Sequence, residues 1–151
     1  MDEKKKKVVL AADHAGFELK EKLKPVFDEN EILYEDISPE LVRDDDYPDH
    51  AFRGARKVVR EKTRGVFVCG SGMGMWIAAN KVRGIRAVRA YDEKTARMGR
   101  QEDDSNVLCI GARLTDEVSA RKILKAWLTT RFLEGRHTRR VNKIIEFEKG
   151  R

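Results

Sequence analysis

Cysteine is scarce in this sequence of 151 residues, which contains only Cys69 and Cys109. Two cysteines cannot build the dense disulfide framework of a small secreted domain, and their spacing matches no zinc motif. We therefore expect reduced thiols in a cytoplasmic protein. The chain is long enough to bury a core without such cross-links, so we expect a single domain over residues 1–151.

Long apolar runs are also absent. No stretch approaches the roughly 20 residues that a helix needs to span a bilayer. The basic start "MDEKKKKVVLAA" lacks the long apolar segment of a secretory signal. We therefore predict no membrane partner, and residues 1–7, with Lys4 to Lys7, are predicted to form a basic tail.

The net charge of +6 raises the question of a nucleic-acid partner. Much of the positive excess lies in the tail and in the last third of the chain, and acidic residues are interleaved elsewhere. No basic stretch carries the aromatic platform that stacks nucleic-acid bases. We predict that no nucleic acid is bound.

What the sequence does contain is an alternation of strand-like and helix-like segments. Short apolar runs at 7–12, 32–37, 65–70, 85–91 and 106–111 predict five strands, and helix-like segments follow each of them. The segments 116–133 and 137–150 are predicted to form the last two helices. This alternation predicts an α/β fold, a Rossmann-like three-layer α/β/α sandwich around a five-stranded parallel sheet.

Several polar and glycine-rich signals follow the ends of predicted strands. Asp13 and His14 follow the first strand, Cys69 to Gly74 follow the third, and Gly111 to Arg113 follow the fifth. In parallel sheets ligands bind beyond the carboxyl ends of the strands, where loops and helix N-termini converge. The sequence therefore predicts a binding site at this edge of the sheet.

The stretch "FVCGSGMGMWIAANKV" changes from a strand-like to a helix-like pattern at Cys69. Three alternating glycines let the backbone turn sharply, and their N–H groups can form a nest for an anion. The spacing matches neither standard nucleotide-binding loop, which disfavours a nucleotide-binding domain. A thiolate beside such a nest suits proton abstraction next to a carbonyl. The alternative is a buried cysteine that ends a core strand, with Ser71 as a helix cap.

Five longer motifs occur in order: "ADHAGFELKEKL", "DYPDHA", "VCGSGMGMWIAANKVRGIRAV", "NVLCIGARL" and "FLEGRHTRRV". Together they resemble the type B ribose-5-phosphate isomerases, whose family also holds galactose-6-phosphate and allose-6-phosphate isomerases. The resemblance covers residues 8–145. It implies a sugar-phosphate isomerase that interconverts ribose 5-phosphate and ribulose 5-phosphate without metal or organic cofactor. It also implies a homodimer, or a dimer of dimers, with active sites shared between subunits.

The resemblance assigns catalytic roles to individual residues. Cys69 corresponds to the base that moves a proton between the first two carbons of the sugar. Some relatives use a glutamate instead, but that position is Met75 here. Ser71 stands where threonine is usual, and Asp13 corresponds to an aspartate that binds sugar hydroxyls or helps to open the ring.

The substrate-binding positions follow in the same way. The resemblance places the phosphate against His14, Arg113, Arg136 and Arg140, with His137 as a further candidate, and the helix over 137–151 reaches the partner subunit. Without the resemblance, the two arginines of that helix fit a solvated basic face, and His14 fits a capping or loop histidine. The pocket is completed by Tyr47 and by backbone N–H groups that hold the enediolate at Gly70, Gly72 and Gly74.

One departure from the family pattern bears on the substrate. The family has "R-x-H-N" before the fifth strand, whereas this chain has Glu102 and Asp103 in place of the histidine and asparagine. A carboxylate about 4 Å from a forming enediolate would cost on the order of 4 kcal/mol at a dielectric of about 20. Glu102 could take over ring opening if its carboxyl is protonated, or the substrate could be a tetrose phosphate that needs no ring opening. The substrate could also be a hexose phosphate, or the protein could bind sugar phosphates without catalysis.

Overall fold

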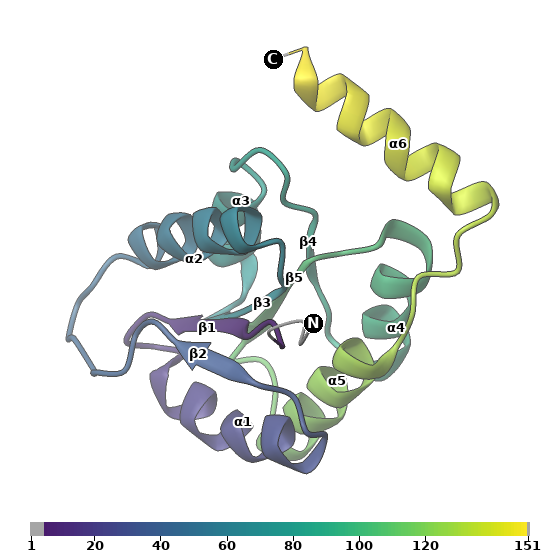
Figure 1. Cartoon of the computed structure of the whole chain (residues 1–151). Helices are drawn as coiled ribbons and strands as arrows, with labels where there is room; N and C mark the ends of the chain where they lie inside the picture. Colours follow the sequence, from purple (N-terminus) through teal and green to yellow (C-terminus); the bar gives the residue numbers. More distant parts are fainter. Residues whose placement is uncertain (1–4, 151) are drawn as a thin grey trace.

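The computed structural model describes residues 5–150, which form a sheet of five parallel strands between two layers of helices (Figure 1). Residues 1–4 of the predicted basic tail and residue 151 of the predicted last helix lie outside the described residues. The strand order is β2-β1-β3-β5-β4. The predicted parallel α/β sandwich is confirmed. The strands are β1 (Val8–Ala12), β2 (Tyr34–Asp36), β3 (Gly65–Cys69), β4 (Ala87–Arg89) and β5 (Val107–Gly111).

The three central strands form because they are short apolar runs that are covered on both faces. Every residue of β1, β3 and β5 is buried, as expected for parallel strands under two helical layers. Alternate residues face opposite layers, so that Val66 and Val68 join one apolar cluster while Phe67 and Cys69 join the other.

Within residues 5–150, six helices surround or extend from the sheet. α1, α4 and α5 contribute to one apolar cluster, and α2 and α3 contribute to the other. α6 belongs to neither layer and runs beside the body of the domain (Figure 1), where it contacts α4 and where its Glu148 accepts from the Gly84 N–H at 3.0 Å. The helices are α1 (Phe17–Glu29), α2 (Tyr47–Glu61), α3 (Met73–Ala79), α4 (Glu93–Asp103), α5 (Glu117–Thr129) and α6 (Arg136–Lys149).

The predicted helix over 116–133 is too long, because α5 ends at Thr129. The hydroxyls of Thr129 and Thr130 donate to carbonyls four residues back, at 2.7 and 2.6 Å, and Thr130 is already extended. Such local side-chain bonds compete with helix continuation. Leu133 then donates its N–H to the Gln101 carbonyl, which ties the following segment to α4.

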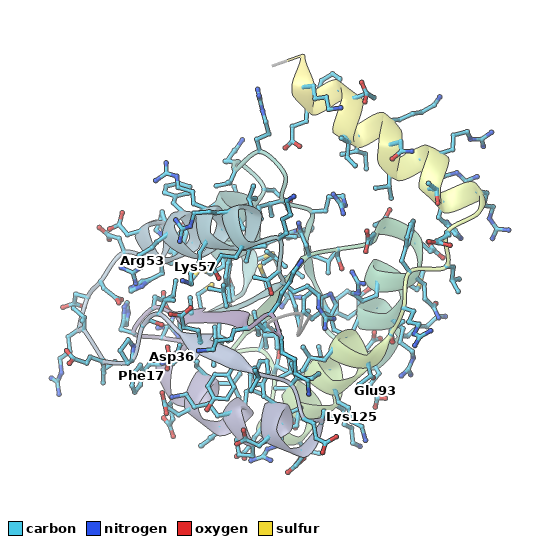
Figure 2. All side chains as sticks on the ribbon, in the orientation of Figure 1. Phe17, Asp36, Arg53, Lys57, Glu93 and Lys125 are labelled. Atoms are coloured by element: carbon cyan, nitrogen blue, oxygen red, sulfur yellow. The ribbon has the colours of Figure 1, made fainter. Side chains whose placement is uncertain are left out.

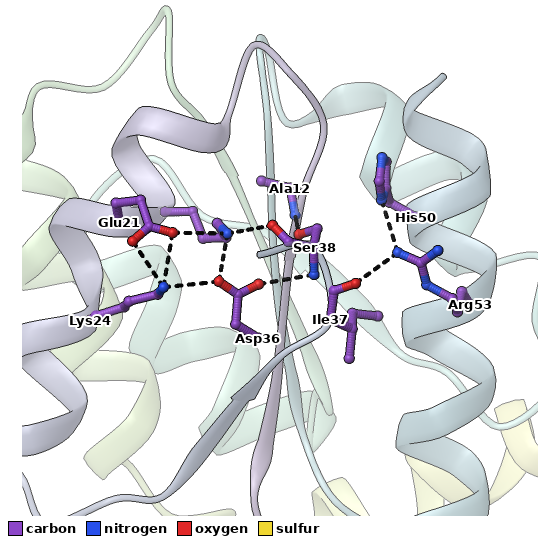
Figure 3. A network of polar contacts seen from close by, with 9 residues as sticks. Ala12, Glu21, Lys24, Asp36, Ile37, Ser38, His50 and Arg53 are labelled. Atoms are coloured by element: carbon purple, nitrogen blue, oxygen red, sulfur yellow. Dashed lines mark hydrogen bonds and ion pairs between the residues drawn. The ribbon is translucent and has the colours of Figure 1, made fainter. Parts of the chain in front are cut away.

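A fully buried lysine links α1 to the end of β2. Lys20 contacts the carboxylate of Asp36 and the carbonyl of Ser38, both at 2.6 Å, and Lys24 binds the same carboxylate at 2.9 Å (Figure 3). The ammonium of Lys20 also lies 4.4 Å from the ring centre of Phe17, which sits beside Asp36 (Figure 2). Because a buried charge needs partners, this network explains how a lysine occupies the core face of α1.

In the part of the chain that the structure describes, no helix combines the length and the apolar character that a membrane crossing requires.

Candidate active site

The candidate site is a cavity of about 390 Å³ at the carboxyl ends of β1, β3 and β5. β1 continues into α1 on one face of the sheet, and β3 continues into α3 on the other face. The two loops therefore diverge at a topological switch point, where open α/β sheets bind their ligands. The cavity is lined by Asp13, His14, Ala15, Tyr47, Cys69, Gly70, Ser71, Gly74, Arg113 and Leu114.

Cys69 ends β3 with its sulfur beside the turn into α3. The N–H of Gly72 donates to Cys69 Sγ over 3.2 Å, and Gly72 has the left-handed φ of 77° that glycine adopts without strain. This differs from the expected role of Gly72, because its N–H is directed at the sulfur. In the described part of the chain, the N–H groups of Gly70 and Ser71 bond to no protein acceptor, so they are available to an oxyanion.

The second cysteine differs sharply from Cys69. Cys109 is completely buried in β5, and burial together with the nearby Cys69 raises the pKa of its thiol well above the ordinary value. Cys109 does not line the cavity. The structure therefore leaves Cys69 as the thiol that a ligand can reach.

Two glycines let larger side chains close over the site. A Cβ on Gly74 would lie 2.5 Å from the ring of Tyr47, and a Cβ on Gly70 would lie 2.9 Å from the guanidinium of Arg113. The backbone of Arg113 also donates to the Gly70 carbonyl at 2.8 Å. These close approaches bring a phenol and a guanidinium to the wall that carries Cys69.

Ser71 has features of both predicted roles. Its hydroxyl oxygen accepts from the Met73 N–H at 3.1 Å, as a residue at a helix start often does. It also lines the cavity, where its O–H remains free to donate to a ligand. The Ser71 carbonyl accepts a hydrogen bond from Arg89 Nε at 2.8 Å.

Asp13 and His14, which follow β1, also line the cavity. One oxygen of Asp13 accepts from the Gly16 N–H at 3.0 Å, and in the described residues its second oxygen has no protein partner. His14 pairs through Nδ1 with Asp45 at 2.8 Å. This side-chain hydrogen bond raises the pKa of His14 above 6.5. Partial desolvation opposes the increase, and the negative charge of Asp13 adds to the increase.

Three of these groups could also be considered as metal ligands. Ligand atoms of Asp13, His14 and Asp45 lie within 4.8 Å of one another. However, both oxygens of Asp45 and one oxygen of Asp13 already accept hydrogen bonds from protein donors. The carboxylate of Asp45 is therefore fully engaged within the protein and, among the described residues of this cluster, leaves only Asp13 with a free oxygen, so we assign no metal here.

The other predicted site residues do not line this cavity in the single chain. Arg136 and Arg140 are exposed on α6, while His137 is buried at the start of that helix. Glu102 and Asp103 end α4, just before β5 begins, and therefore lie at the amino edge of the sheet. The Asp103 carbonyl accepts from Arg86 there at 3.0 Å.

The sequence analysis missed two residues that shape the site, Asp45 and Arg89. Asp45 belongs to a run of three aspartates that ends immediately before Tyr47, which marks an acidic loop but does not identify its contacts. Arg89 ends the edge strand β4 and gives no motif signal. Both act through contacts between segments that lie far apart in the sequence.

Comparison with known proteins places this geometry in a family. Residues 8–144 match the family described as Ribose/Galactose Isomerase, so the chain belongs to that family. The resemblance seen in the sequence motifs is thereby confirmed, and the family is one of aldose–ketose isomerases.

Three relatives illustrate the range within the family. Ribose-5-phosphate isomerase B of Escherichia coli is 37% identical over 147 residues, covering 97% of this chain and 99% of that protein. D-erythrulose-4-phosphate isomerase 2 of Mycolicibacterium smegmatis is also 37% identical over 147 residues, covering 94% and 97%. The crystal structure of ribose-5-phosphate isomerase B from Mycoplasma genitalium with bound ribulose-5-phosphate matches with a TM-score of 0.91 and 38% identity, covering 96% and 97%.

Proposed function

We propose that this protein interconverts ribose 5-phosphate and ribulose 5-phosphate through an enediolate. The observation that carries the proposal is the arrangement of Cys69, which lines the cavity beside backbone N–H groups that have no protein acceptor in the described residues. A base and an oxyanion nest at one place are what proton transfer next to a carbonyl requires. Relatives named for ribose 5-phosphate support this choice of substrate.

The proposed reaction begins with the open-chain aldose, and Asp13 binds its hydroxyls. Cys69 Sγ, as the thiolate, removes the proton from carbon two, and the electron pair moves to the carbonyl oxygen on carbon one. The N–H groups of Gly70 and Ser71 stabilise the resulting enediolate. Ser71 Oγ assists proton movement between the two oxygens, and the thiol returns its proton to carbon one. No oxidant or cofactor enters this balance.

The phosphate end requires positive charge, which the single chain supplies in part. His14 and Arg113 line the cavity. The exposed Arg136 and Arg140 are proposed to enter the cavity of a second subunit and to pair with phosphate oxygens. α6 buries only His137 and Val141 and leaves the apolar side chains of Ile144 and Phe147 exposed, which supports a homodimer in which α6 packs on the partner.

Proton exchange tests the proposed function directly. In heavy water, wild-type protein should replace the carbon-two proton of ribose 5-phosphate with deuterium, and ribulose 5-phosphate should appear in the NMR spectrum. Tight binding without exchange for pentose, tetrose and hexose phosphates would instead identify a sugar-phosphate-binding protein without this activity.

A tetrose phosphate is the second candidate substrate. It is favoured by Glu102 and Asp103, which replace the histidine and asparagine of the family pattern, and by the relative named for D-erythrulose 4-phosphate. A four-carbon sugar 4-phosphate cannot close the usual five-membered ring, because its terminal hydroxyl carries the phosphate. It therefore needs no group that opens the ring.

Restoring the histidine of the family pattern at position 102 distinguishes the two candidate substrates. If ring opening limits the wild type, Glu102→His should raise kcat/KM for ribose 5-phosphate by about tenfold or more and leave erythrulose 4-phosphate within about twofold. Glu102 lies away from the cavity of its own chain, so it could open the ring only in the cavity of a second subunit. If it already does so, the substitution should give no gain with ribose 5-phosphate. Both substrates are measured with wild type and variant on the same day and at the same pH.

A further inference from the structure

Asp45 joins two histidines from separate parts of the chain. Its Oδ1 accepts from the backbone N–H of His14 and pairs with His14 Nδ1, both at 2.8 Å. Its Oδ2 pairs with His50 Nε2 at 2.7 Å. The carboxylate therefore connects the loop after β1 to the first turns of α2, and its side chain is only 13% exposed.

The hydrogen bonds of His50 define which of its nitrogens carries the proton in the neutral ring. Arg53 approaches His50 Nδ1 at 3.2 Å and donates to the Ile37 carbonyl at 2.9 Å (Figure 3). A guanidinium can only donate, so His50 Nδ1 must be the unprotonated acceptor. The proton of a neutral His50 consequently lies on Nε2, from which it is donated to Asp45.

A neutral His50 does not balance the negative charge of Asp45, so that charge acts on His14. Partial burial opposes ionisation of Asp45, but hydrogen bonds from His14 and His50 outweigh it and lower the pKa of the carboxyl. Asp45 thus stays ionised, and it holds His14 by both the backbone and Nδ1. With Nδ1 engaged, Nε2 is the nitrogen of His14 that remains for a ligand, and His14 lines the cavity.

We propose that Asp45 is a positioning residue that keeps His14 protonated, so that His14 Nε2–H binds the phosphate of the substrate as a charged donor. This inference rests on the proposed function for the identity of the anion, a phosphate ester. A neutral imidazole can donate one weak bond, whereas an imidazolium adds a charge-assisted bond to an oxyanion. Asp45 itself touches no substrate and acts through His14.

Other charged and titratable groups share the cavity with His14. Asp13 precedes it on the same loop and adds negative charge close by. The remaining groups come from α2, from the end of β3 and from the loop after β5, and all line the same cavity: Tyr47, Cys69 and Arg113. Arg113 is the single cation among them. A neighbouring positive charge disfavours a second one, so Arg113 cannot be the cause of a charged His14. The carboxylate of Asp45 remains the direct cause.

The pH dependence follows from the raised pKa of His14. Anion binding that uses imidazolium should be strong below the pKa of His14 and should weaken as the pH rises through that value. Asp45→Asn keeps the shape of the side chain but removes its charge. The loss of anion affinity should then begin at a lower pH than in the wild type.

NMR tests the charge state without any enzyme assay. The chain has three histidines, and the His14 cross-peak is identified by its loss in His14→Gln. Titration should give a lower His14 pKa in Asp45→Asn than in wild type. The control is Asp44→Asn, which makes the same charge change at an exposed neighbour whose left-handed φ of 55° suits asparagine, and which should leave His14 unchanged.

Sulfate binding tests the consequence, because sulfate keeps its charge throughout the neutral range. At neutral pH, Asp45→Asn should weaken sulfate binding by about tenfold, and the difference from wild type should shrink towards acid pH. In a His14→Gln background the same Asp45→Asn substitution should have no further effect. A purely structural role for Asp45 would instead weaken binding in both backgrounds.

The inference is overturned if the pKa of His14 is the same in Asp45→Asn and wild type, or if the sulfate loss persists without His14. If Asp45→Asn fails to fold, Asp45→Ser, which also lacks the carboxylate, replaces it in every comparison. Neither readout requires isomerisation. If both tests give the expected results but no sugar proton is exchanged, the proposed reaction is wrong and the role proposed for Asp45 still holds.

Discussion

The backbone N–H of Gly72 donates to Cys69 Sγ over 3.2 Å, so the turn that leads into α3 holds the sulfur of a residue that lines the cavity. A donor aimed at the sulfur stabilises negative charge on it. The same turn leaves the N–H groups of Gly70 and Ser71 for the substrate. The proposed base and the proposed oxyanion donors are therefore parts of one backbone turn, and their relative positions are fixed by its conformation.

Cys69→Ala is expected to abolish turnover and to preserve anion binding. Loss of the general base should lower kcat by about 1000-fold, measured as exchange of the carbon-two proton, because no other described cavity residue combines a thiol with this position. Sulfate affinity should stay within about twofold, since His14 and Arg113 are untouched. Cys109→Ala is the matched control, because it removes a thiol outside the cavity and should retain exchange. Equal losses of exchange and of sulfate binding would contradict the assignment of Cys69.

Gly16→Ala is expected to destabilise the protein through a clash with backbone. A Cβ at Gly16 would lie 2.2 Å from the carbonyl oxygen of Val68, and a backbone atom of a central strand cannot move aside as a side chain can. We expect the free energy of unfolding in urea to fall by about 3 kcal/mol. Gly150→Ala, where the nearest atom is 3.6 Å away, should change it by less than about 0.5 kcal/mol. Similar values for the two variants would show that the loop after β1 adapts.

The network around Asp36 predicts a stability that depends on pH. Burial opposes ionisation of Asp36, but hydrogen bonds from Lys20 and Lys24 outweigh it and lower its pKa below 3.8. A lowered pKa means that this contribution is fully present above the ordinary aspartate value and is lost as pH falls through the folded value. Acid should therefore reduce the free energy of unfolding less steeply in Asp36→Asn than in wild type.

At neutral pH, Asp36→Asn should cost about 3 kcal/mol, because it leaves the buried ammonium of Lys20 without its carboxylate. Urea unfolding at several pH values measures both effects. Asp28→Asn, at an exposed position of α1, should follow the wild-type curve. Parallel pH curves for wild type and Asp36→Asn would refute the linkage to Asp36.

Local patterns predicted the strands and the position of the cavity. The apolar runs that became β1, β3 and β5 are unambiguous because parallel central strands are buried on both faces. The glycine-rich turn after Cys69 also carries its signal within a few residues. Family resemblance then supplied the reaction class, which these patterns alone left open.

Contacts between distant segments could not be read from the sequence. The Asp45 bridge to His14 spans 31 residues, and nothing in the aspartate run distinguishes Asp45 from its neighbours. Lys20 likewise looks like a solvent-facing residue of an amphipathic helix until β2 brings Asp36 against it. The end of α5 was misplaced because the threonine hydroxyl bonds that compete with the helix are invisible in a hydrophobic pattern.

Complementation between two inactive variants tests whether the sites are shared. Cys69→Ala removes the proposed base, and Arg140→Ala removes a proposed phosphate ligand that lies on α6, outside the cavity of its own chain. In a mixed dimer one site receives both defects, and the other receives an intact Cys69 and an intact Arg140. Random mixing after unfolding and refolding should thus restore about a quarter of wild-type exchange activity, since half of the dimers are mixed and each has one intact site.

The unmixed variants, refolded in parallel, provide the control and should remain inactive. A mixture of Cys69→Ala with Cys69→Ala,Arg140→Ala should also stay inactive, because no subunit in it carries the base. If the first mixture recovers no activity while refolded wild type does, Arg140 does not complete the site of a partner subunit. The phosphate would then be held by His14 and Arg113 of the same chain, and the position of α6 would need another explanation.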